Sequence, residues 1–248
     1  MPPITSSQNP IIKLIRSLKE KKFRLESGLF VAEGWEMLNR AKREGWMPQH
    51  LLSTEAIPPW GEAKPMLVSE KVMASLSGQN NPHTVLATFR QLYTVEVKPE
   101  GTWIALEDMR DPGNLGTIIR TADAVSAAGI VLLGASCDPY SQECVRASTG
   151  SIFAVPLVQM ETAAFVALSQ SRKGDVVGTD SKATENFRRN YLVPTLLVMG
   201  SEGQGLSDEL KAACKTLARI PMSGGAESLN VATATALMLY EIRKNELN

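Results

Sequence analysis

Three glycine-containing loops hold the side chains of this sequence that are best suited to chemistry. The first loop, DPGN at residues 111–114, leads into a segment with apolar residues at i, i+3, i+4 and i+7. That spacing predicts a helix with one buried stripe, and Arg120 lies well round the helix from it. A guanidinium can grip a phosphate bidentately or stabilise a developing oxyanion. The competing interpretation is an ion pair with Asp123 on the same helix. The stripe comprises Leu115, Ile118, Ile119, Ala122 and Val125.

The second loop lies within LLVMGSEGQGLSDEL, residues 196–210, directly after an apolar run. Gly200, Gly203 and Gly205 permit a positive φ and let a ligand approach the backbone amides closely. The spacing is neither G-x-G-x-x-G nor G-x-x-x-x-G-K-S/T, so it matches neither the dinucleotide fingerprint nor a P-loop. Glu202 lies between these glycines. Its carboxylate would repel a bare phosphate, but it could orient a hydroxyl group or a cationic ligand.

The third loop lies within ARIPMSGGAESLNVATATALMLYEI, residues 218–242. An expected strand ends at Ile220 and runs into a double glycine, after which SLN, residues 228–230, opens a long helix. Ser228 is suited to capping that helix. Asn230 has no evident packing role and is therefore a candidate site residue. The small residues that follow would let another backbone come close, either within the fold or in a subunit contact.

The elements that position these loops form a regular pattern in the second part of the chain. WIALEDM, GIVLLG, DVVGTD and TLLVMGSE are continuous apolar runs that end in turn residues and alternate with helical segments. Such runs are typical of strands buried on both faces of a parallel sheet with helices on both sides. Ligands bind beyond the carboxyl ends of these strands, where the three loops lie.

The N-terminal part also alternates strands and helices. Residues 10–26 are expected to form one basic amphipathic helix, residues 28–34 a strand and residues 35–45 a second helix. VKPEGT, residues 97–102, is the best candidate linker. We therefore expect two domains, residues 1–98 and residues 99–248.

Composition narrows the class of protein. The 248 residues are 44% hydrophobic and 21% charged with a net charge of zero, which is ordinary for a soluble globular protein. No apolar run is long enough to span a membrane, and the N-terminus lacks the order of a secretory signal. Three cysteines and two distant histidines indicate neither a disulfide framework nor a metal site. We expect a cytoplasmic protein. Residues 1–24 carry a local charge of +5, which could attract a phosphate backbone or could be only a solvated helix face.

Together, the three loops resemble the three motifs of the SpoU (TrmH) branch of the SPOUT RNA methyltransferases. N-x-G-x-x-x-R matches Asn114, Gly116 and Arg120, and G-S-E-G-x-G-L matches residues 200–206. I-P-M followed by S-L-N matches residues 220–222 and 228–230, and the whole match spans roughly residues 103–245. The N-terminal part more loosely resembles the ribosomal-protein-like substrate-binding domain that many members carry.

The resemblance implies an α/β fold: a C-terminal parallel-sheet SPOUT domain with a deep trefoil knot, preceded by a small α/β ribosomal-protein-like domain. It also implies a homodimer that transfers a methyl group from S-adenosyl-L-methionine to a ribose 2′-hydroxyl of ribosomal or transfer RNA, without a metal. The implied cofactor contacts are Gly200, Ile220 and Leu229, with Thr179 or Gly203 nearby. The implied catalytic residues are Arg120, Asn114, Glu202, Ser228 and Asn230.

Two alternatives stay open beside the ribose methyltransferase. A SPOUT relative that methylates a base is disfavoured by the S-L-N motif together with Arg120. A catalytically silent RNA-binding protein that assists ribosome assembly would be expected to lack the arginine or the asparagine, and both are present. The mechanism that the resemblance implies has Arg120 act as a base once a phosphate engages it. Because a free guanidinium is a poor base at neutral pH, electrostatic activation of the hydroxyl is the interpretation that we favour, and the two stay open.

Overall fold

The computed structural model describes residues 2–77 and 81–247. The chain divides into two compact units. One comprises Met1–Leu92 together with Asp138–Ala154, and the other comprises Tyr93–Cys137 together with Val155–Asn248. Residues 138–154 therefore fold with the N-terminal unit although they lie between two stretches of the C-terminal one. Within the described residues, no helix has the length and apolar character needed to cross a bilayer.

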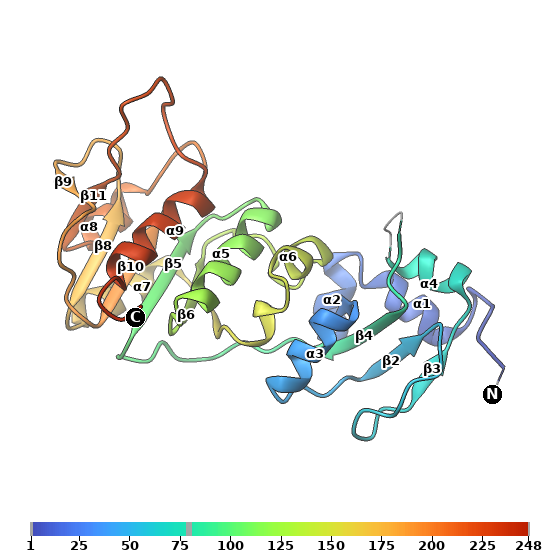
Figure 1. The fold of residues 1–248 in the computed structure, drawn as a ribbon. Helices are drawn as coiled ribbons and strands as arrows, with labels where there is room; N and C mark the ends of the chain where they lie inside the picture. The colour runs from blue at the N-terminus through green and yellow to red at the C-terminus, as the bar shows by residue number, and fades with distance from the viewer. Residues whose placement is uncertain (1, 78–80, 248) are drawn as a thin grey trace. The chain divides into compact units, whose positions relative to one another are not determined.

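The N-terminal unit is built on a mixed sheet (Figure 1). Its strand order is β1 (Leu29–Glu33), β4 (Val85–Arg90), β2 (His50–Ser53) and β3 (Pro65–Leu67). β4 is antiparallel to both neighbours, whereas β2 and β3 are parallel. The helical elements of this unit are α1 (Pro10–Ser17), α2 (Lys21–Ser27), α3 (Trp35–Arg43), α4 (Glu70–Ser77), α6 (Gln142–Ala147) and the 3-10 helix η1 (Ser151–Phe153).

An aromatic cluster shows why residues 138–154 belong to this unit. Tyr140 and Phe153 pack against Phe30 of β1, with ring centroids 4.7 and 5.8 Å apart. The ring of Phe153 also meets Trp46 and Phe89 at 5.1 and 5.0 Å. Because aromatic rings bury large areas, this cluster holds the segment in the N-terminal unit.

The single helix expected over residues 10–26 is wrong, because the chain forms α1 and α2 with a break at residues 18–20. Asn9 caps α1 through its side chain, and the helix ends at Leu18, which is fully buried. Arg24, counted above as part of the local positive charge, is only 4% exposed and faces inward. Arg24 therefore belongs to the packed interior of the unit and not to a solvated helix face.

The C-terminal unit confirms the predicted parallel sheet. Within the described residues, seven strands lie in the order β7-β6-β5-β10-β8-β11-β9, and every pair of neighbours is parallel. The four runs singled out in the sequence are β5 (Thr102–Glu107), β6 (Gly129–Leu133), β8 (Asp175–Thr179) and β10 (Thr195–Met199). The remaining strands are β7 (Leu157–Met160), β9 (Glu185–Asn186) and β11 (Thr216–Arg219).

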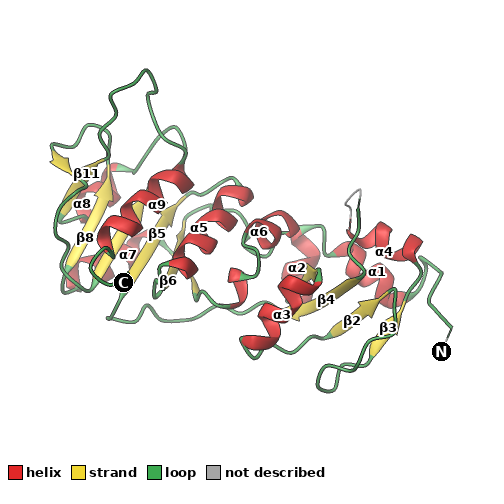
Figure 2. Ribbon diagram, in the orientation of Figure 1, coloured by secondary structure: helices red, strands yellow, loops and turns green. Residues whose placement is uncertain are grey.

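Helices cover both faces of this sheet (Figure 2). α5 (Pro112–Ala124) and α9 (Val231–Ile242) lie side by side on one face. α7 (Thr162–Ser171) and α8 (Asp208–Ala213) pack on the other, where Phe165 and Leu210 join Trp103 and Val198 in one hydrophobic core. The α/β fold class is thus confirmed, while the deep trefoil knot stays a prediction.

Candidate active site

The three loops begin at one edge of the parallel sheet. β5, β10, β8 and β11 are adjacent in the sheet, so their carboxyl ends lie together. β6 and β7, which follow β5 in the chain, lie on one side of β5 in the sheet, whereas β10 and β8 lie on its other side. The strand order therefore reverses between β5 and β10. The ends of β5 and β10 are level, because Leu106 pairs with Met199. In open sheets of this kind ligands bind at such a switch point.

The helix that bears Arg120 begins earlier than the DPGN turn suggested. Asp111 caps α5 by accepting a hydrogen bond from the backbone N of Asn114 at 2.7 Å, and Pro112 takes the first helical position. The predicted stripe of five apolar residues is fully buried. Arg120 is exposed and forms no hydrogen bond or ion pair with any part of the chain that is described, so the ion pair with Asp123 does not form.

The side chain of Asn114 joins the three loops. Its Nδ2 donates to Oε1 of Glu202 in the second loop. Its Oδ1 accepts from Nδ2 of Asn230 in the third loop, at 2.9 Å. One amide therefore uses its donor on one loop and its acceptor on the other. We call Asn114, Glu202 and Asn230 the amide–carboxylate cluster.

Asn230, and not Ser228, caps α9. The Oδ1 of Asn230 accepts from the backbone N of Ala232 at 2.9 Å and of Thr233 at 3.3 Å. The expectation that Ser228 caps the helix is therefore wrong, because the helix begins two residues later. Ser228 is exposed and makes no hydrogen bond with the described residues. Its hydroxyl is available to a ligand.

The second loop needs glycine at Gly200. A Cβ atom at this position would overlap the backbone of Gly205 and Leu206. Ser201 and Gly205 close the loop through two backbone hydrogen bonds, of 3.2 and 3.0 Å. Gly203 and Gly205 have φ angles of +84° and +71°, which other residues rarely adopt. The closed loop holds Glu202 at its exposed side, where the carboxylate meets Asn114.

Glu107 is a structural support that the sequence reasoning missed. It ends β5, its side chain is buried, and its Oε2 accepts from the backbone N of Ser207 at 2.8 Å. Ser207 in turn caps α8. Glu107 thereby anchors the far end of the glycine loop to the strand before Arg120. The available signal was an acidic residue that closes an otherwise apolar strand.

The residues expected to hold the cofactor lie at the same edge of the sheet. Thr179 ends β8, and its hydroxyl lies 3.6 Å from Sδ of Met199 at the end of β10. Ile220 follows β11 and is half-buried, whereas Leu229 is 36% exposed. Gly203 lies in the glycine loop. Within the described chain, no hydrogen bond links these residues to the amide–carboxylate cluster. The two groups have in common that both follow the carboxyl ends of strands in the same sheet.

Comparison with known proteins decides the family. The model of the "SpoU rRNA Methylase family" matches residues 101–240, and that of an "MRM3-like substrate binding domain" matches residues 9–87. The chain belongs to the SpoU rRNA methylase family. An uncharacterised tRNA/rRNA methyltransferase of Synechocystis sp. is 34% identical over 98% of this chain and 94% of its own length. The 23S rRNA (guanosine(2553)-2′-O)-methyltransferase RlmP of Bacillus subtilis is 29% identical over 98% and 100%.

Solved structures of SpoU methyltransferases share the whole fold. The rRNA methyltransferase from Sinorhizobium meliloti with bound AdoMet is 38% identical, with a TM-score of 0.91 over 100% of this chain and 99% of that one. The SpoU methyltransferase AviRb from Streptomyces viridochromogenes, in complex with the cofactor AdoMet, is 27% identical, with a TM-score of 0.85 over 97% and 99%. The resemblance read from the three motifs is thereby confirmed.

Two further observations bear on the chemistry of this SpoU family member. Among the described residues, no group of three or more histidine, cysteine or acidic side chains could hold a metal ion. Cys214 lies between α8 and β11, and its Sγ donates to the carbonyl of Leu210 at 3.1 Å. Burial raises the pKa of its thiol to about 12. Since the thiolate is the nucleophilic form, Cys214 is an inert packing residue.

Proposed function

We propose that this protein transfers the methyl group of S-adenosyl-L-methionine to a ribose 2′-hydroxyl of ribosomal or transfer RNA. The observation that carries the proposal is the amide–carboxylate cluster, because it joins residues from all three motifs at the carboxyl edge of the sheet. Two similarities support the proposal: RlmP is named a 2′-O-methyltransferase, and the similar structures from Sinorhizobium meliloti and Streptomyces viridochromogenes contain bound AdoMet.

Arg120 activates the hydroxyl in this proposal. A ribose 2′-hydroxyl is a poor nucleophile, so transfer requires loss of its proton or stabilisation of the developing negative charge. The exposed guanidinium has no partner in the described chain and can bind an RNA phosphate bidentately while it faces the hydroxyl oxygen. The new bond forms between this oxygen and the methyl carbon, the carbon–sulfur bond breaks, and the hydroxyl proton leaves to solvent.

The other four residues hold the reacting groups in place. Asn114 and Asn230 already constrain each other through the 2.9 Å hydrogen bond, so they present a fixed edge to the nucleotide. Glu202 orients Asn114, and the free hydroxyl of Ser228 can bond to the substrate. Positioning of this kind supplies much of the rate in a transfer from a reactive donor.

The residues at the strand ends fit the cofactor. The closed turn at Gly200 and the positive φ at Gly203 leave backbone groups accessible to a ligand. Ile220 and Leu229 offer apolar surface to an adenine ring, and Thr179 offers a hydroxyl. When bound, S-adenosyl-L-methionine supplies an electrophilic methyl group on a sulfonium. The remaining work falls to the protein: it orients the hydroxyl and stabilises the negative charge that develops on its oxygen.

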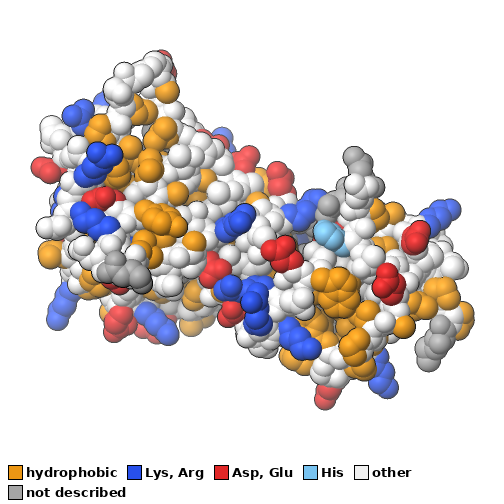
Figure 3. All heavy atoms as spheres, in the orientation of Figure 1, with side chains coloured by type: hydrophobic (Ala, Val, Ile, Leu, Met, Phe, Trp, Pro, Cys, Tyr) orange, Lys and Arg blue, Asp and Glu red, His pale blue; other side chains and the backbone are white. Residues whose placement is uncertain are grey.

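We further propose that two copies of the chain associate through the face formed by α5 and α9. Leu237 and Tyr240 of α9 are 39% and 53% exposed. Figure 3 shows hydrophobic side chains gathered where Figure 1 draws α9. A second copy would cover them and bring its own loops near Arg120. In this proposal residues 1–98 form the RNA-binding domain and residues 99–248 the knotted methyltransferase domain, except that residues 138–154 fold with the N-terminal unit. The enzyme works in the cytoplasm.

One experiment tests the proposed function. The protein is incubated with methyl-labelled S-adenosyl-L-methionine and unmodified total RNA, and the RNA is then hydrolysed in alkali. A 2′-O-methyl group blocks strand cleavage, so the label is expected in alkali-resistant dinucleotides. Label only in mononucleotides would indicate base methylation. Absence of label in RNA that the protein binds would indicate a silent RNA-binding protein.

A further inference from the structure

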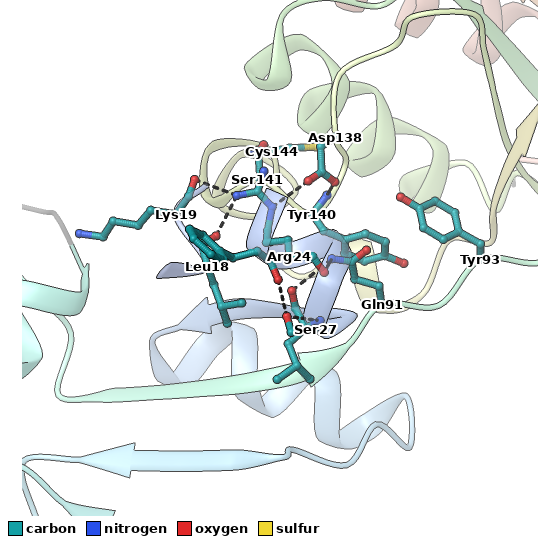
Figure 4. A network of polar contacts seen from close by, with 12 residues as sticks. Leu18, Lys19, Arg24, Ser27, Gln91, Tyr93, Asp138, Tyr140, Ser141 and Cys144 are labelled. Carbon is teal, nitrogen blue, oxygen red and sulfur yellow. Dashed lines mark hydrogen bonds and ion pairs between the residues drawn. The ribbon is translucent and has the colours of Figure 1, made fainter. Parts of the chain in front are cut away.

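A buried guanidinium organises the N-terminal unit around Arg24. Its Nε donates to Oδ2 of Asp138 at 2.7 Å, and the two side chains are only 5% and 6% exposed. Asp138 opens the segment 138–154, which lies between β6 and β7 in the sequence but folds with the N-terminal unit. Figure 4 shows Arg24 at the centre of the contacts that join these segments.

The same guanidinium fixes the turn between α1 and α2. Its Nη1 donates to the carbonyl oxygens of Leu18 and Lys19, each at 2.8 Å. Carbonyls at a helix C-terminus have no partner within the helix, so this bond replaces the missing one. On the far side, Oδ1 of Asp138 accepts from the backbone N of Tyr140 at 2.8 Å. The turn is therefore tied to the segment 138–154 through one ion pair.

Three lysines flank this turn and face solvent: Lys19, Lys21 and Lys22, which we call the basic corner. Lys21 has no partner among the described residues. Lys22 is 3.9 Å from Glu26, with both side chains more than half exposed, and Nζ of Lys19 donates to the carbonyl of Ser75 at 3.2 Å. Figure 4 shows the side chain of Lys19 extending away from Arg24. The backbone of the corner is fixed while its charges stay available.

We propose that the basic corner binds the phosphate backbone of the substrate RNA, and that the Arg24–Asp138 pair is its positioning device. The inference rests on the proposed function, since it takes RNA as the substrate. Cations on a pre-organised turn bind phosphates without sequence preference and release counterions. Arg24 fixes the backbone of the basic corner through its bonds to the carbonyls of Leu18 and Lys19. Asp138 makes the segment 138–154 a working part of the RNA-binding unit.

The surface is tested by RNA binding at several salt concentrations. The probe is a fluorescein-labelled, mixed-sequence single-stranded RNA of about 30 nucleotides, read by anisotropy. Lys19→Ala/Lys21→Ala/Lys22→Ala is expected to flatten the slope of log affinity against log salt by about 2, since each phosphate contact to a single strand contributes about 0.7. The wild type then loses roughly 20-fold more affinity than the variant between 50 and 200 mM salt.

A matched triple variant controls for net charge. Lys42→Ala/Arg43→Ala/Lys71→Ala removes three exposed cations from α3 and α4 of the same unit. It is expected to keep a steeper slope than the corner variant. Equal slopes for the two triple variants would overturn the assignment of the surface.

The positioning role is tested with Arg24→Lys, which keeps the charge opposite Asp138 but cannot also reach both carbonyls. KM for RNA is expected to rise about fivefold, with kcat and cofactor affinity unchanged. Combined with the corner triple variant, Arg24→Lys is expected to add no further loss, because it acts through the corner. Additive losses, or a wild-type KM in a folded Arg24→Lys protein, would refute the role. A wild type that binds RNA but transfers no label contradicts the proposed function alone.

Discussion

The donor and the acceptor of the hydrogen bond between Asn114 and Glu202 can be exchanged by substitution. This exchange tests whether the bond positions the substrate for methyl transfer. Asn114→Asp replaces the donating amide with a second carboxylate of the same shape. The helix cap is untouched, because Asp111 bonds to the backbone N of residue 114 and not to its side chain. The bond from Asn230 also survives, since Asp retains the accepting oxygen.

The size of the effect follows from the exposure of the two groups. Two carboxylates about 4 Å apart repel by about 1 kcal/mol in water and by about 4 kcal/mol at the effective dielectric of a protein surface. Glu202 is exposed and Asn114 is half-buried, so the lower part of that range applies. With about 1 kcal/mol for the lost hydrogen bond, the change costs about 2–3 kcal/mol. If the cluster holds the substrate in place, methyl transfer slows by about 30- to 150-fold.

The assay is single-turnover transfer of labelled methyl groups to unmodified total RNA, performed on a double-mutant cycle. Glu202→Gln supplies a donating amide opposite the new carboxylate, so Asn114→Asp/Glu202→Gln restores the bond with donor and acceptor exchanged. We expect the double variant to recover at least tenfold over Asn114→Asp. The two losses would instead add if the hydrogen bond had no role in positioning, and a double variant no faster than the slower single variant would refute the reasoning.

The remaining predictions concern Arg120, Gly200 and His50. Arg120→Ala is expected to reduce transfer by at least a thousandfold while calorimetry shows unchanged cofactor affinity; near-normal turnover would contradict its role. Gly200→Ala places a Cβ against the backbone of Gly205 and Leu206, so cofactor affinity should fall at least tenfold and the protein should lose about 1–3 kcal/mol of stability. Burial lowers the pKa of His50 below its ordinary value of 6.5, so the folded imidazole stays neutral where the unfolded one is protonated. Stability is therefore complete above about pH 6.5 and falls as the pH drops through the lowered pKa. Thermal unfolding at several pH values should show this loss, and His50→Gln should remove it.

Much of the C-terminal unit could be predicted because its signals are local. A strand buried on both faces must be apolar along its whole length, and β5, β6, β8 and β10 each show such a run. The stripe on α5 follows from helical spacing, which also placed Arg120 outside the core. The short strands β7 and β9 carry too few residues for a pattern, and their pairing depends on neighbours distant in the sequence.

The predictions that failed involve long-range contacts. The spacing of residues 10–26 suits one helix, but the chain turns at residues 18–20, where the carbonyls of Leu18 and Lys19 accept from Arg24, which also pairs with Asp138 more than a hundred residues away. Ser228 and Asn230 are both good capping residues. In the fold Asn230 caps α9 with its Oδ1 and at the same time bonds through its Nδ2 to Asn114, which lies on another helix.

By itself, the sequence determined the class of fold, the order of the three motifs and the chemical groups that they carry. These properties depend on residue types within a few positions of one another. Only the tertiary structure decided that one amide of Asn114 serves two loops, that Glu107 anchors the glycine loop, and that residues 138–154 fold with the N-terminal unit. Each of these depends on contacts between residues that lie far apart in the sequence. Glu107 is a buried carboxylate that needs a partner once water is excluded, whereas the bonds of Asn114 form because the sheet brings three loops together, and residues 138–154 are held by aromatic packing.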